Sequence, residues 1–328
     1  MSKKKTSLTA AQRHAAAVDM TNYYLSSYWT DWRYVHILTT KKLLDEKYNF
    51  FHSIVKDSLK EADEASIAQE IKHGLYHDAI AQCVQYIEDL FALFYASKEP
   101  DYFIRNIVSY SAGQVTNLIK GFKGTDQRIK TVFFIPEPVE SFSSEHHEYY
   151  NKGLKILKDT LAELIEFYIG YEFFYTQYKH GLSIPLRTFC NRYSQDQIEK
   201  EKKGEMPNWL AVFDNLNLKA ATVKKNFNTS RGLFFPSFTD NVRFNLTGLQ
   251  NEDNYLRFVF PPDIDVTIDY FVKIAHQTRY CINIFRTNFL NSINSPSEMK
   301  IYNLPTDPEK NTTIQITVNE GNEAKGAQ

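Results

Sequence analysis

A histidine at the end of an aromatic stretch is the residue best suited to chemistry in this chain. His180 follows Lys179 and precedes Gly181. Histidine changes its charge near neutral pH, so it can transfer a proton, and the neighbouring lysine can contact a phosphate group. The same residues also suit the end of a helix, because cations complement the helix dipole and glycine adopts the left-handed cap conformation. Proton transfer with phosphate contact and helix termination are therefore two interpretations of one cluster.

A second group of candidates mixes basic and aromatic side chains in the C-terminal half. Such a mixture suits single-stranded RNA, since cations contact phosphates and aromatic rings stack on bases. In a chain with 21 Tyr and 24 Phe, the same residues also suit strands that pack on helices. The basic residues expected at a nucleic-acid surface are Arg187, Lys224, Lys225, Arg231, Arg243 and Arg257.

Metal and cofactor sites have weaker support. His73 and His77 are four residues apart, so they would share a helix face as a zinc pair requires, but the spacing supplies no third ligand. The distant cysteines, Cys83, Cys190 and Cys281, exclude a C-x-x-C site and a disulfide framework. No Gly-rich phosphate loop or dinucleotide fingerprint is present. We therefore expect no metal and no cofactor.

The net charge of -1 gives no overall basic field to gather nucleic acid, so RNA binding would depend on the local patch. Hydrophobic residues at 43% and charged residues at 23% are ordinary for a folded globular protein. The most apolar run, residues 161–176, contains Glu163, Glu166 and Glu172 and is shorter than the ~20 residues of a membrane span. No signal peptide is recognisable. We expect a cytoplasmic protein with no membrane segment.

The elements that must position His180 are long amphipathic helices. Apolar residues recur at a period near 3.6 through four stretches, which are residues 19–60, 62–97, 102–122 and 145–179. The first stretch, with Trp32, Val35 and Leu38 in its apolar stripe, is compatible with one helix or with two joined near Thr39 and Thr40. Residues 131–135 resemble a short strand. This pattern predicts a flexible tail over residues 1–18 and a helical bundle over residues 19–186.

After Pro185 the composition changes, and residues 187–320 are expected to form a smaller α+β portion. Strand-like residues 242–246 and 255–260 flank a turn-rich segment, which predicts a β-hairpin at about 242–260. A final helix is expected at about 266–291, a further strand at 313–318 and a disordered tail at 321–328. The expected fold class is mainly α, a long-helix bundle followed by this α+β portion.

The late helix ending in Tyr178-Lys179-His180-Gly181 and the earlier Cys83-Val84-Gln85-Tyr86 segment together resemble the HEPN superfamily. The resemblance covers roughly residues 20–185 and implies a compact, usually dimeric helical bundle. Many members are metal-independent ribonucleases of bacterial defence and toxin systems, and others are inactive. Their active motif is an arginine, then four to six residues, then a histidine. His180 matches the histidine, but residues 173–175 supply no arginine.

The resemblance implies an RNA-directed protein in which His180 is the general base and Lys179 or Arg187 replaces the missing cation. Neighbouring residues on a helix point about 100° apart, which is a poor arrangement of Lys179 and His180 for one joint site. The missing arginine favours the alternative interpretation, a non-enzymatic interaction or scaffold protein. Such a protein would form a homodimer or dock a partner through its helical bundle.

Overall fold

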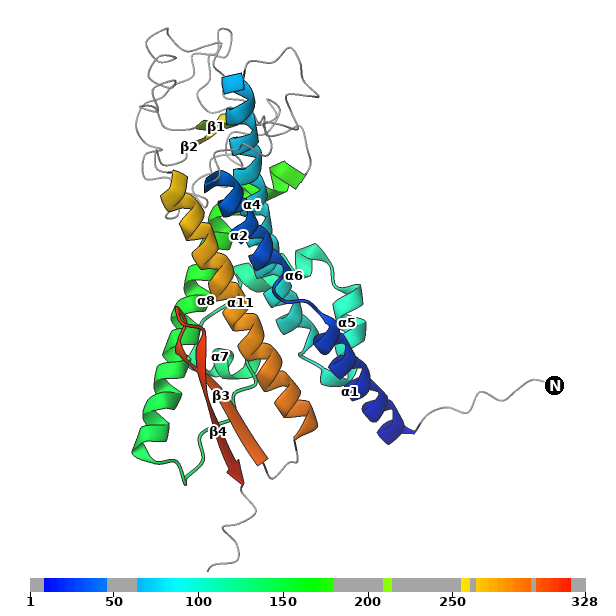
Figure 1. Cartoon of the computed structure of the whole chain (residues 1–328). Coiled ribbons are helices and arrows are strands. Elements are labelled where there is room, and N and C mark those ends of the chain that lie inside the picture. Colours follow the sequence, from blue (N-terminus) through cyan, green and yellow to red (C-terminus); the bar gives the residue numbers. More distant parts are fainter. Residues whose placement is uncertain are drawn as a thin grey trace, which may run out of the picture. The chain divides into compact units, whose positions relative to one another are not determined.

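The computed structural model describes six ranges, which are residues 9–45, 64–179, 209–213, 255–259, 264–295 and 299–319 (Figure 1). The chain divides into two compact units. Unit 1 comprises Met1–Trp32, Ile87–Ile165 and His276–Gln328, and unit 2 comprises Arg33–Tyr86 and Glu166–Ala275. Each unit is therefore assembled from segments that are far apart in the sequence.

Helices make up most of the described residues (Figure 1). In chain order they are α1 (Ala10–Ser27), α2 (Trp32–Asp45), α4 (Glu64–Ala96), the 3-10 turn η1 (Pro100–Tyr102), α5 (Phe103–Ser109), α6 (Ala112–Lys120), α7 (Asp126–Val132), α8 (Ser144–Lys179) and α11 (Ile264–Asn294). The described strands form two antiparallel pairs, β1 (Trp209–Phe213) with β2 (Tyr255–Val259) and β3 (Met299–Asp307) with β4 (Thr312–Asn319). The prediction of a mainly α helical bundle with a smaller C-terminal α+β portion is confirmed.

Side-chain caps decide where several helices begin. Thr9 and Gln12 form a capping box at α1, in which the Gln12 N–H donates to Thr9 Oγ1 at 3.2 Å and the Thr9 N–H donates to Gln12 Oε1 at 2.9 Å. Ser111 and Gln114 form another at α6. These bonds satisfy N–H groups that the first turn of a helix leaves without partners. Residues 10–18 are therefore helix, and the prediction of a tail over 1–18 is wrong for this part.

Two further local predictions are wrong. The chain leaves the first helix at Tyr28, whose backbone is extended, and residues near Thr39 lie inside α2. The Thr39 and Thr40 hydroxyls donate to the carbonyls of Val35 and His36 at 2.9 Å and 3.1 Å, so the pair is accommodated within a helix. Residues 131–135 do not form a strand, because α7 runs to Val132 and ends at its C-cap Phe133. This helix begins at Thr125, whose hydroxyl accepts a hydrogen bond from the Arg128 N–H at 3.3 Å.

The strand predictions are confirmed in part. Residues 255–259 form β2, but their described partner is β1, with Trp209 opposite Val259. The remainder of the expected hairpin, residues 242–254, lies outside the described residues. The strand predicted at 313–318 is β4, and it pairs with β3 across a bulge near Pro305.

The interior of unit 1 is built from aromatic rings on sequence-distant segments. Phe94 of α4 meets the Phe133 and Phe285 rings edge-to-face at centroid distances of 5.1 Å and 5.6 Å. Near β3, Phe142 packs on Tyr302 at 4.9 Å, and the Tyr302 hydroxyl donates to the Glu137 carbonyl at 2.8 Å. Edge-to-face pairs stabilise the fold beyond the burial of apolar area, and they fix the relative orientation of the rings. They therefore hold these segments of unit 1 together.

The interior of unit 2 is centred on Phe271 of α11. Its ring contacts Tyr76, Phe167 and Tyr171 at centroid distances of 6.1 Å, 6.1 Å and 5.9 Å, all edge-to-face. The Cys83 thiol donates to the Phe271 carbonyl at 3.4 Å. Burial raises the pKa of the Cys83 thiol well above its usual value, which keeps this cysteine protonated and unreactive. Phe167, Tyr168, Tyr171 and Tyr175, from the aromatic stretch before His180, are therefore core residues.

Helix α8 approaches β3 closely at Gly153. A Cβ at this position would lie 3.0 Å from Leu304 Cβ and 3.3 Å from Pro305 Cδ. A methyl group fits here only if the strand moves. We therefore expect Gly153→Ala to lower the free energy of unfolding by about 1–3 kcal/mol, measured by urea denaturation and circular dichroism.

Gly74 in α4 provides the matched control, because an added Cβ there meets no atom within 4 Å. Replacing a glycine inside a helix by alanine removes backbone entropy from the unfolded chain, so Gly74→Ala should stabilise by roughly 0.5–1 kcal/mol. Effects of the same sign and size at both positions would contradict the close approach of α8 and β3.

Candidate interaction surface

Most of the predicted site residues lie outside the described residues. Lys179 is the last residue of α8 and its side chain is exposed. Arg257 is in β2, opposite Ala211 of β1. The predicted residues outside the described ranges are His180, Arg187, Lys224, Lys225, Arg231 and Arg243. Neither the His180 site nor the basic surface is tested, and both stay predictions.

The structure instead reveals large apolar side chains on the surface of unit 1. Met20 is 55%, Tyr23 76%, Trp29 60% and Trp32 52% exposed. We call this surface the aromatic face, and its members are Met20, Tyr23, Trp29, Trp32, Tyr102, Val108 and Tyr110. They come from α1, the start of α2, η1, α5 and the residue after α5, and α1 lies against both η1 and α5.

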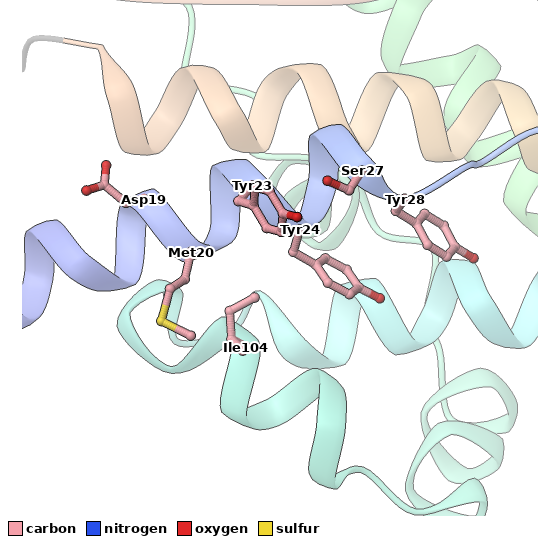
Figure 2. Close-up of a pocket in the computed structure, with 7 residues that line it drawn as sticks. All are labelled: Asp19, Met20, Tyr23, Tyr24, Ser27, Tyr28 and Ile104. Atoms are coloured by element: carbon pink, nitrogen blue, oxygen red, sulfur yellow. The ribbon is translucent and has the colours of Figure 1, made fainter.

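A groove of about 590 Å³ lies between α1 and α5 within this face (Figure 2). Its lining consists of Asp19, Met20, Tyr23, Tyr24, Ser27, Tyr28 and Ile104. All but Ile104 belong to the α1 segment or its C-cap, at spacings of three and four residues that place them on one helix face. Figure 2 shows Met20 and Ile104 approaching each other from the two helices. The groove is therefore an apolar channel along α1, closed on one side by α5.

The opposite side of α1 is fastened to the rest of unit 1. Leu25 is buried, and Asn22 exchanges amide hydrogen bonds with Asn294 of α11 at 3.0 Å and 2.9 Å. Just after α1, Asp31 accepts two bonds from Arg279 of α11, Nε to Oδ1 at 2.6 Å and Nη2 to Oδ2 at 3.2 Å. This bidentate ion pair is the strongest geometry available to a carboxylate and an arginine. It fixes the C-terminal end of α1 to α11, and no described residue covers the side of α1 that lines the groove.

Contacts with neighbouring rings and with Asp89 hold Tyr24 and Tyr28 of the groove in place. Tyr24 stacks on Tyr28 with centroids 5.9 Å apart and planes at 11°, and it meets Phe103 edge-on at 5.9 Å. The Tyr28 hydroxyl donates to Asp89 Oδ2 at 3.2 Å. Burial raises the pKa of Tyr24, with further contributions from Asp89 and Tyr110, so its phenol stays protonated and can donate a hydrogen bond. The groove therefore presents fixed rings with a polar edge.

One end of the groove carries an acidic group. Asp19 is exposed there, and it forms no ion pair with another described residue. Near the other end, Asp89 lies outside the lining, is partly buried and accepts a hydrogen bond from the Tyr28 hydroxyl. None of the lining residues is a cation. The groove is therefore apolar along its length and negative at the Asp19 end.

Unit 2 has a polar seam between α2 and α4, which we define as Arg33, His36, Asp78, Gln82 and Gln85. The His36 ring is hydrogen-bonded to Asp78, and the two side chains are 32% and 33% exposed. One helical turn earlier, Arg33 Nη1 donates to the Oε1 atoms of Gln82 and Gln85 at 2.9 Å and 2.5 Å. A carboxylate can orient a histidine for proton transfer, and an arginine can bind a phosphate group. The same bonds also join the two helices.

Comparison with protein-family models, curated proteins and solved structures finds no match for this chain. The HEPN-like relationship accordingly stays a prediction. In the described ranges, no helix is long and apolar enough to cross a membrane, and no group of three or more His, Cys, Asp or Glu side chains is placed to hold a metal ion.

Sequence analysis placed Trp32, Val35 and Leu38 in one apolar stripe and did not single out Met20 or Tyr23. Trp32, Val35 and Leu38 are exposed, whereas Ile37 and Leu44 are the buried apolar residues of α2. A helix with apolar residues on more than one face gives the same near-3.6 period whichever face is covered. The available signal was an excess of large apolar residues over what one stripe can bury.

If Tyr23 serves binding and not folding, its removal should leave stability almost unchanged. We expect Tyr23→Ala to change the free energy of unfolding by less than about 0.5 kcal/mol, as is usual for surface substitutions. Phe103→Ala, which removes a fully buried ring below the groove, should cost about 3–5 kcal/mol. Urea denaturation of both variants decides this, and a large cost for Tyr23→Ala would return that residue to the core.

Proposed function

We propose that this chain is a non-enzymatic interaction protein that docks a protein partner through the aromatic face and its groove. The observation that carries the proposal is that the exposed side chains of Met20 and Tyr23 line a groove in which Tyr24 and Tyr28 are held by packing on other rings. Contiguous exposed apolar surface on a folded protein marks an interaction site. The proposed location is the cytoplasm.

The chemistry of the aromatic face favours a protein partner. Aromatic side chains and methionine are enriched in the cores of protein interfaces, whereas lysine and glutamate are depleted there. The groove lining contains three tyrosines and a methionine and neither lysine nor glutamate. Because Tyr24 and Tyr28 are already held by packing, little side-chain entropy is lost when a partner covers them. Both features support docking through this surface.

A photocrosslinking amino acid in place of Tyr23 tests the docking proposal in cells that express the chain naturally. We expect a defined crosslinked adduct, because this ring is 76% exposed and lines the groove. The adduct should disappear when Met20→Asp is introduced in the same chain, since a charge in the apolar channel must be desolvated on binding.

The matched control places the same crosslinker at Lys155, an exposed residue of α8 outside the groove. Identical adducts at positions 23 and 155 would indicate nonspecific crosslinking and would refute the docking proposal. The absence of any adduct at position 23 would refute it as well.

The polar seam supports a second candidate function, RNA cleavage without metal. His36 paired with Asp78 is a candidate general base, and Arg33 lies one turn away on the same helix. Cleavage through the RNA 2′-hydroxyl needs a base and a cation that stabilises charge on phosphorus. These residues would supply both, independently of His180 and Lys179 from the HEPN-like interpretation.

Cleavage of labelled single-stranded RNA in the presence of a chelator tests this second candidate. If the seam is the site, His36→Ala should reduce the rate about 10²–10⁴-fold, the usual contribution of a general base. His180→Ala tests the site predicted by the resemblance, and His14→Ala, an exposed histidine paired with Asp101, is the control. No cleavage by the native chain would exclude ribonuclease activity, and equal rates in every variant would exclude both His36 and His180 as the catalytic base.

A further inference from the structure

We propose that the partner contributes an amphipathic helix to the groove, with apolar side chains along the groove and a lysine or arginine at the end that faces Asp19. This inference rests on the proposed function and adds the class of partner. It follows from three properties of the groove, which are its length, its fixed rings and the position of its charge.

The length of the groove suits a short stretch of helix. From Asp19 to Tyr28, nine residues along α1, the helix rises about 14 Å at roughly 1.5 Å per residue. A partner helix lying alongside presents about two and a half turns over this distance, which places anchors at positions i, i+4 and i+7 in contact with the channel. The two lining helices offer the wall on each side that a helix-in-groove complex requires (Figure 2).

The charge at the groove selects a basic partner. Asp19 is exposed at one end of the apolar channel, and the lining residues contain no cation. A lysine or arginine at that flank of the partner's apolar stripe would pair with this carboxylate, and it would also contact tyrosine faces through cation–π attraction. An acidic residue there would be repelled. The proposed partner motif is therefore an apolar stripe of about two turns flanked by a basic residue.

Two other occupants fit the groove less well. A second copy docked groove to groove would bring a second Asp19 and no cation to the groove, so the exposed carboxylates would stay without opposite charges. A small apolar ligand is normally enclosed over most of its surface, whereas Tyr23 and Met20 are 76% and 55% exposed here. An open channel with a carboxylate at one end suits a helix that remains partly in solvent.

A displayed library of helical peptides, randomised at the stripe and at both flanks, tests the proposal on the full chain. Selected peptides should share apolar residues at i, i+4 and i+7 with a lysine or arginine at one flank. Asp19→Asn should weaken their binding roughly two- to fivefold, the range for an exposed ion pair. Asp159→Asn, which removes an exposed carboxylate of α8, should leave binding unchanged.

Selected peptides that are acidic, that lack helical periodicity or that bind Met20→Asp equally well would overturn the proposal, as would a library that yields no binder. A concentration-dependent dimer that Tyr23→Asp abolishes in sedimentation would identify a second copy as the occupant and would also overturn it. The two proposals can fail separately. A crosslinked adduct at Tyr23 without basic helical peptides would retain docking and reject the helix, and loss of that adduct would reject docking itself.

Discussion

The arrangement of unit 1 around its aromatic face depends on the pairing of Asp31 with Arg279. Two hydrogen bonds join these side chains, and they fix the turn after α1 to α11. Both groups are only partly exposed, at 33% and 26%, so water screens their attraction less than it would at an open surface. With α1 held on this side, the helix cannot rotate to bury its other apolar face. The exposed rings are consequently a fixed feature of the folded chain.

The abundance of aromatic residues explains how one chain has both a dense core and an apolar surface. Edge-to-face contacts of Phe94 and Phe271 organise the interiors of the two units. Tyr24 and Tyr28 belong to both environments, since their inner edges pack on other rings and their outer edges line the groove. A tyrosine suits this position because its ring is apolar and its hydroxyl reaches water or a polar partner.

The long helices could be predicted from the sequence, because the period of apolar residues fixes their existence over many turns. The α4, α8 and α11 segments were anticipated in this way. The boundaries of shorter helices depend on single capping residues, such as Thr9 at α1 and Thr125 at α7, which a periodic pattern of apolar residues does not reveal. The groove could not be predicted, because periodicity identifies apolar faces and does not reveal which face another segment covers.

The two candidate sites differ in how their side chains are already paired, and this difference bears on function. In the polar seam, His36 and Arg33 make hydrogen bonds that also hold α2 against α4, so a substrate would have to add to or compete with interactions that stabilise unit 2. In the groove, Asp19 and the apolar edge of Tyr23 have no such structural task within the described residues. Binding there costs no internal contact and removes apolar surface from water, and a cation on the partner would offset the cost of desolvating Asp19. That balance of free energies is why docking, and not catalysis, is the stronger inference from this structure.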